Sequence, residues 1–321
     1  MFYPELDYRL ESDDPSLTIE TGRLVAKVID NNGLRRLDAK PYFGKPVFGT
    51  FTHHFGYHGI RTLYDKAERR NVVAPFVSIL NWQNVRIDDV ELDPVDDRAA
   101  YGVPRGWPLV LRQFDGEVSL RLDPMPLGEF AYRLTIRPAA DESPDALDFS
   151  VRFLFGKKSA NGRFSASWAC YLAGWDTVAM HYPAHAAQPA GVRGDSHELS
   201  RLVWKTIGDP PDMVIGEPVG YVHDQAAFAP DDVALPLAYV RIGERVFVLM
   251  FGDPAVRPFL VNSGGHLFCS PVQNPALDFL WEIAEPPTDA SVGFDGRLVY
   301  TVYAGDDDIL RRYEAFVGGA S

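Results

Sequence analysis

Apolar and polar residues alternate with a period of two in many short stretches of this chain. Residues 118–122 alternate and stop at Asp123-Pro124, and residues 130–136 alternate and stop at Arg137-Pro138. Successive side chains of a strand point to opposite faces, so this pattern predicts strands with one buried face. The same reasoning predicts further strands at residues 24–29, 147–155, 164–172, 202–206, 235–242, 246–251, 279–283 and 298–302.

Turn and helix signals complete this pattern. Gly243-Glu244, between two predicted strands, indicates a tight hairpin. One helix is predicted near the C-terminus, where Asp306, Asp307 and Asp308 supply an N-cap and a negative first turn. Its apolar side consists of Ile309, Leu310, Tyr313 and Phe316.

Many short strands separated by 25 prolines and 27 glycines are typical of an all-β protein. Between the sandwich and barrel architectures that this pattern allows, we expect a large antiparallel β-sandwich with a short C-terminal helix. Proline-rich joints at residues 104–108 and 209–212 are too short and too apolar for flexible linkers. Residues 1–321 are accordingly expected to form one sandwich domain.

Charge and composition exclude some partners. The formal net charge of -13 argues against nucleic acid and against anionic membrane surfaces, which both need a basic footprint. Residues 1–7 have no signal-peptide pattern, and no stretch approaches the roughly 18 apolar residues of a membrane span. A cytoplasmic location is expected. The two cysteines, Cys170 and Cys269, are interpreted as buried thiols.

The densest polar segment covers residues 51–66. It contains three of the eight histidines, His53, His54 and His58, and it also contains Tyr57, Arg61 and Tyr64. Imidazoles exchange protons near neutral pH, and an arginine can orient hydroxyls or carboxylates, as a sugar site requires. Alternatively, the histidines are interior hydrogen-bonding groups. No cofactor is expected, although the histidine cluster leaves a divalent metal open.

Two further segments add candidate residues. Trp168 and Tyr171 have aromatic faces that suit a sugar ring, and core packing in a sandwich is the alternative for both. His181 lies next to a tyrosine and a proline, which indicates a strand end. His223 belongs to a separate polar segment, residues 219–225, and can reach a cleft if it lies in a turn.

Carboxylates lie on one face of the predicted strand near residue 280. Asp278, Leu280 and Glu282 share this face, and Phe279, Trp281 and Ile283 share the other. Carboxylates two residues apart on a face lie roughly 7 Å from each other, which would permit a shared acid/base site. We include Asp278 and Trp281 among the expected sugar-binding residues and Glu282 among the catalytic ones. A strand with one face in solvent is the alternative.

The N-terminal residues 17–26, followed by Asn32-Gly33-Leu34, resemble the opening strands of galactose-mutarotase-like supersandwich proteins. That superfamily includes aldose 1-epimerases, polysaccharide lyase domains and accessory domains of glycoside hydrolases. The resemblance implies a carbohydrate ligand. The histidine motif of mutarotases is not reproduced, because His53-His54 lies too early in the chain.

The leading hypothesis is an enzyme that cleaves a sugar derivative by acid/base chemistry, as a lyase or a glycoside hydrolase. One of His53, His54 and His58 would be the acid or base, with His181, His223 or Glu282 opposite and Tyr57 or Tyr64 assisting. An epimerase and a non-catalytic carbohydrate-binding protein are the alternatives. The partner would be a small carbohydrate, and the sequence leaves a homodimer open.

Overall fold

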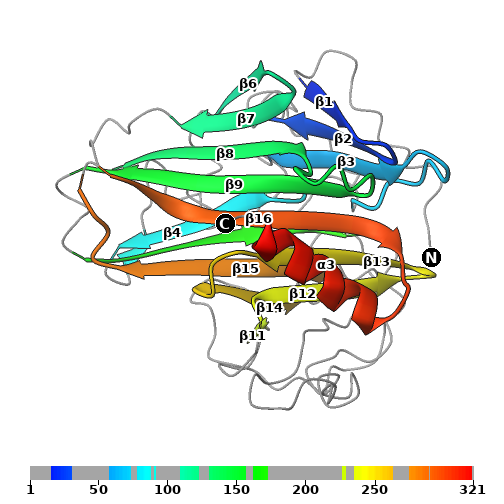
Figure 1. Ribbon diagram of the computed structural model, residues 1–321. Coiled ribbons are helices and arrows are strands. Elements are labelled where there is room, and N and C mark those ends of the chain that lie inside the picture. The colour runs from blue at the N-terminus through cyan, green and yellow to red at the C-terminus, as the bar shows by residue number, and fades with distance from the viewer. Residues whose placement is uncertain are drawn as a thin grey trace, which may run out of the picture.

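The computed structural model describes residues 16–30, 58–73, 78–87, 90–91, 109–122, 130–156, 162–172, 226–228, 235–262, 275–288 and 290–319. These residues form antiparallel sheets with a helix on one outer face (Figure 1). The expected all-β sandwich is therefore confirmed. Most of the predicted strands are present, and residues 202–206 lie outside the described part.

Three sheets make up the described structure. The small sheet consists of β1 (Ser16–Glu20), β2 (Leu24–Ile29) and β3 (Gly59–Asp65). The six-stranded sheet has the order β11 (Ala226–Phe228), β14 (Val256–Asn262), β15 (Pro275–Ala284), β10 (Arg163–Ala169), β4 (Asn81–Ile87) and β5 (Val90–Glu91). The seven-stranded sheet has the order β12 (Leu237–Ile242), β13 (Arg245–Phe251), β16 (Ser291–Val302), β9 (Ala146–Phe155), β8 (Phe130–Pro138), β7 (Glu117–Leu122) and β6 (Val110–Phe114).

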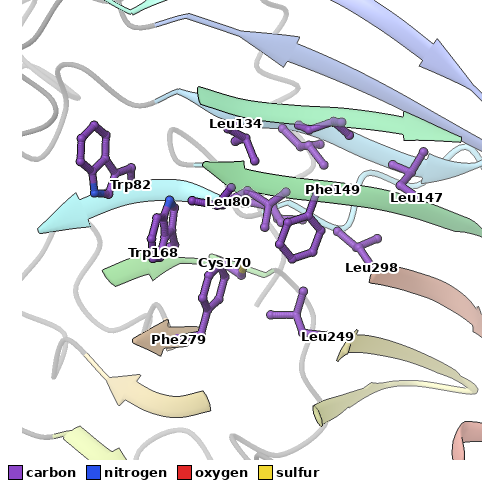
Figure 2. Packing of buried hydrophobic residues seen from close by; sticks show 14 of the residues in the cluster. Leu80, Trp82, Leu134, Leu147, Phe149, Trp168, Cys170, Leu249, Phe279 and Leu298 are labelled. Carbon is purple, nitrogen blue, oxygen red and sulfur yellow. The ribbon is translucent and has the colours of Figure 1, made fainter. Parts of the chain in front are cut away.

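The core lies between the two large sheets. Trp82 of β4 stacks on Tyr132 of β8 with ring centroids 4.0 Å apart, and Phe153 of β9 stacks on Trp281 of β15 at 5.7 Å. Figure 2 shows aromatic and aliphatic side chains of this core packed against one another. Burial of so many large rings supplies the main driving force for closing the sandwich.

A second apolar layer covers the outer face of the seven-stranded sheet. Helix α3 (Asp306–Gly318) buries Ile309, Tyr313 and Phe316 against residues of β12, β13 and β16. Figure 1 shows the helix lying across these strands. This arrangement follows from the apolar side of the helix that the sequence predicts.

The prediction that an aspartate caps the N-terminus of α3 is wrong. Gly305 occupies the N-cap position, and no side chain caps the helix. The carboxylate of Asp306 instead accepts hydrogen bonds of 2.6 Å from the hydroxyls of Tyr239 and Tyr303. The acidic first turn is confirmed, as is the tight hairpin at Gly243-Glu244 between β12 and β13.

Candidate functional site

Buried polar side chains are the first candidates for a functional site, because burying a polar group without a hydrogen-bond partner costs free energy. Two groups are structural. Asp65 and Arg245 form an ion pair, and Asp145, Asp148 and Arg297 belong to charge pairs near α3. Outside these ion pairs, several buried polar residues lie on or next to the six-stranded sheet. They are His58, Arg61, Ser78, Asn81, Ser167 and Asp278.

A hydrogen-bonded corner joins β3 to β4. The backbone N–H of His58 donates to Oδ1 of Asn81 at 3.3 Å, and the hydroxyl of Ser78 donates to the carbonyl of His58 at 2.7 Å. The backbone N–H of Trp82 donates to Nε2 of His58 at 3.0 Å. Because Nε2 is an acceptor, the imidazole carries its hydrogen on Nδ1. We call His58, Ser78 and Asn81 the polar corner.

The backbone at the polar corner is held in uncommon conformations. Gly59 has a φ of 98°, and a Cβ at this position would lie 2.4 Å from the carbonyl oxygen of Ile79. Leu80 has a φ of 58°, which is the left-handed region that L-residues other than glycine rarely adopt. Strained backbone of this kind persists where the surroundings over-determine it, and it concentrates at functional sites.

Asn81 of the polar corner also belongs to a row of three residues that crosses three neighbouring strands. Asn81 of β4 pairs with Ala169 of β10. Ala169 lies opposite Asp278 of β15, because Trp168 pairs with Phe279 and Tyr171 with Ala276. Paired residues share a face, so the three side chains lie on one side of the sheet. We call Asn81, Ala169 and Asp278 the outer row.

The outer row faces away from the core. The neighbours of Asp278 in β15, Leu277 and Phe279, both belong to the core, so the side chain of Asp278 between them points to the opposite face. Trp168 and Cys170 likewise belong to the core, and Ala169 between them does not. Asp278 is nevertheless 1% exposed, so its carboxylate is desolvated. A desolvated carboxylate on the outer face of a central strand suits proton transfer or hydroxyl binding.

Arg61 and Tyr64 lie in β3, which begins directly after His58 of the polar corner. The register of β2 with β3 shifts at Arg61, which is the extra residue of a β-bulge between Ile60 and Thr62. The bulge allows both Ile60 and Leu63 to enter the core. Arg61 itself is 5% exposed, and Tyr64 is half-buried opposite Val25. His53, His54, Tyr57, His181 and His223 lie outside the described residues.

The aromatic candidates separate into two classes. Trp168 stacks on Phe279 at 5.2 Å and donates from Nε1 to the hydroxyl of Tyr132, so its ring belongs to the core (Figure 2). Trp281 is 2% exposed and also lies in the core. Both rings are buried between the two sheets, away from any ligand on the surface. This burial corrects the expectation that Trp168 and Trp281 contact a sugar ring. Tyr171, which follows β10 and forms an isolated bridge with Ala276, lies outside the core cluster, although it is also buried.

The expected carboxylate pair needs a correction. Asp278 and Glu282 share a strand face but are four residues apart, so they lie about 13 Å from each other. Glycosidase carboxylates lie roughly 5 to 9.5 Å apart. Glu282 in addition forms a 2.8 Å ion pair with Arg163, with both side chains partly exposed. These two carboxylates therefore do not form one acid/base site.

Asn81 is the residue that the sequence analysis missed. It is fully buried, and its Nδ2 has no hydrogen-bond partner among the residues that the structure describes. The only signal in the sequence is an amide at the start of a strand, between the core residues Leu80 and Trp82. An asparagine in such a place commonly caps a turn, so the pattern alone does not single it out.

Cys170 lies close to this site without taking a chemical role. Burial raises the pKa of its thiol, the backbone N–H of Leu80 lowers it, and the charge of Asp278 raises it, so that the net pKa lies well above its ordinary value. A protonated thiol is a poor nucleophile. The described residues contain no group of three His, Cys, Asp or Glu side chains that could hold a metal ion.

Comparisons with known proteins agree with the architecture. A crystal structure named "Putative aldose 1-epimerase" from Escherichia coli K12 matches 90% of this chain and 99% of its own, at 11% identity and a TM-score of 0.50. The chain has a galactose-mutarotase-like fold. Galactose 1-epimerase from Lactobacillus acidophilus NCFM matches 89% of this chain and 94% of its own, at 11% identity and a TM-score of 0.43.

The mutarotase-like fold is established by structure and not by sequence. No family model matches this chain, and no curated protein matches it in sequence. Within the described residues, no helix is long and apolar enough to cross a membrane. The expected galactose-mutarotase-like architecture is thus confirmed.

Proposed function

We propose that this protein acts on a carbohydrate as an aldose 1-epimerase, with the carboxylate of Asp278 as the base. The observation that supports this most directly is a desolvated carboxylate on the outer face of the central strand β15, next to the strained polar corner. Interconversion of anomers needs one group that takes the proton of the anomeric hydroxyl and one that protonates the ring oxygen. A single carboxylate and an acid of a different type satisfy this requirement.

Cleavage by a pair of carboxylates receives less support. Glu282 is too far along β15 from Asp278, and Arg163 compensates its charge. The acid in the proposed epimerase would be an imidazole. His181, His223, His53 and His54 are the candidates, and all four lie outside the described residues.

The test is the rate at which the separated anomers of common aldoses interconvert, followed by polarimetry or NMR spectroscopy. We expect wild-type protein to accelerate this reaction without forming new reducing ends or unsaturated products. Asp278→Asn should lower the rate by a factor of about 100 or more, the usual contribution of a positioned base. Asp295→Asn, at an exposed ion pair in the other sheet, is the matched control and should keep the wild-type rate.

Other outcomes would redirect or remove the proposal. New reducing ends or unsaturated products that depend on both Asp278 and Glu282 would indicate cleavage. Sugar binding without any product, and without anomer interconversion above the buffer rate, would indicate a non-catalytic carbohydrate-binding protein.

A further inference from the structure

The amide of Asn81 has an unused hydrogen-bond donor in a buried place. Its Oδ1 accepts the backbone N–H of His58, which fixes the amide so that Nδ2 is directed elsewhere. Nδ2 is buried, and no residue in the described part of the chain is its hydrogen-bond partner. An N–H group left unsatisfied in the interior costs free energy, so native proteins nearly always provide a partner for it. No described residue supplies this partner, and we therefore consider a hydrogen-bond acceptor of a ligand for this position.

The surroundings of Asn81 indicate what kind of acceptor fits. Ala169 separates Asn81 from Asp278 in the outer row and has only a methyl side chain. Neighbouring strands lie about 4.8 Å apart, so the Cα atoms of Asn81 and Asp278 are about 10 Å apart, with only the side chain of Ala169 between them in the row. A donor on one side and a carboxylate on the other match a group that both accepts and donates. A hydroxyl group has this property.

We propose that Asn81 and Asp278 together bind one hydroxyl group of an aldose above Ala169, which makes Asn81 a specificity-determining residue. Nδ2 of Asn81 donates to the hydroxyl oxygen, and the hydroxyl hydrogen is donated to the carboxylate of Asp278. The hydroxyl thereby satisfies the amide and fixes the sugar ring relative to the base. This inference rests on the proposed function, because it uses the same carboxylate and the same class of ligand.

The polar corner keeps this amide in place before a ligand arrives. Ser78 holds the carbonyl of His58, and the His58 imidazole holds the backbone of Trp82. The strained φ of Leu80 sets the direction in which Asn81 leaves the backbone. A donor fixed in this way gives more discrimination between ligands than a mobile one, since less entropy is lost on binding.

The experiment compares Asn81→Ala with a matched control, Asn71→Ala, on a series of monodeoxy aldoses. Asn71 is a suitable control because its Oδ1 also accepts the backbone N–H of a β3 residue, Leu63, at 3.0 Å, and Asn71 itself is exposed. Asn71→Ala loses the hydrogen bond from the backbone of Leu63 in β3. Asn81→Ala loses the hydrogen bond from the backbone of His58, the residue before β3. Only Asn81→Ala also loses the donor of the outer row.

We expect Asn81→Ala to lower kcat/KM for the parent aldose by about tenfold to a hundredfold, the value of one hydrogen bond to a hydroxyl. For one monodeoxy aldose the wild type and this variant should have nearly equal values of kcat/KM, because the hydroxyl that Asn81 contacts is absent. Asn71→Ala should keep the wild-type profile over the whole series. An Asn81→Ala variant that discriminates among the deoxy sugars as the wild type does would overturn the inference, and an ordered water would then be the partner of Nδ2.

A second measurement tests the inference if the protein is not an epimerase or if Asn81→Ala does not fold. If wild-type protein shows no anomer interconversion, the affinities for the same deoxy series are measured by calorimetry with wild type and Asn81→Ser. The hydroxyl contact then appears as one deoxy sugar whose affinity does not change between the two proteins. Uniform changes over the series, or none, would sink the inference independently of whether any reaction occurs.

Discussion

Nη1 of Arg245 lies 3.1 Å from Oδ2 of Asp65, and both side chains are buried. The bond connects β13 of the seven-stranded sheet to β3 of the small sheet. Oδ2 of Asp65 also accepts from Arg23, at 2.7 Å, and Arg245 pairs further with Glu68. The small sheet is therefore attached to the sandwich through one carboxylate as well as through the core.

Asp65→Asn should destabilise the protein by about 3 kcal/mol, because it leaves the buried guanidinium of Arg245 without a full counter-charge. Unfolding in urea, followed by circular dichroism, measures this loss. Glu117→Gln is the control, since the pair of Glu117 with Arg137 is exposed and should contribute less than about 1 kcal/mol. Equal losses in the two variants would contradict the structural role of the buried pair.

Lowering the pH should weaken the ion pair between Asp65 and Arg245. Burial by itself raises the pKa of Asp65, but the N–H of Ala67 and the guanidiniums of Arg23 and Arg245 lower it more, so the pKa lies below its ordinary value. A carboxyl with a lowered folded-state pKa contributes stability above the ordinary pKa of about 4, and this contribution disappears as the pH falls through the folded-state pKa. We expect the unfolding free energy of wild type to fall below about pH 4. Asp65→Asn should show a smaller fall, and an identical pH profile would exclude this cause.

Gly59→Ala should destabilise the protein by about 3 kcal/mol or more, since both the left-handed backbone and the close carbonyl of Ile79 oppose a side chain. Gly116 provides the comparison. It also has a positive φ, 79°, but a Cβ there meets nothing within 4 Å. Gly116→Ala should therefore cost only about 1 kcal/mol. Thermal unfolding of the two variants side by side separates the steric effect from the backbone effect.

The two tyrosines that donate to Asp306 provide a test of how α3 is attached. Tyr239→Phe and Tyr303→Phe should each lower the unfolding free energy by about 1 kcal/mol, the net value of a typical hydrogen bond. Both hydroxyls contact the same oxygen, so the double variant should deviate from the sum of the single ones. Strict additivity would show that the two bonds act independently.

The strands were largely predictable because alternation is a local property. Residues 130–136, for example, alternate in the sequence, and β8 alternates between buried and less buried positions in the structure. Their assignment to three sheets was not predictable, since Tyr171 and Ala276 pair across a long stretch of chain. Local pattern carries no information about such partners.

The candidate site was predictable only in part. Asp278 was selected from strand parity, which depends on neighbouring residues alone. Asn81 could not be selected, because its importance depends on a donor left over after His58 has been satisfied, and that is a tertiary property. The stacking rings of Trp168 and Trp281 were expected at a ligand, but which strand face lies inside depends on the opposite sheet.

β16 determines when this fold can be completed. It pairs with β9 on one side and with β13 on the other, so that Ser291 meets Leu154 and Arg245 meets Val302. The four strands β6–β9 and the hairpin β12–β13 therefore remain two separate parts of the seven-stranded sheet until β16 has been synthesised. Non-local pairing of this kind slows folding. A nascent chain that lacks β16 exposes two strand edges at once, and these edges are where a chaperone or a second nascent chain would engage it.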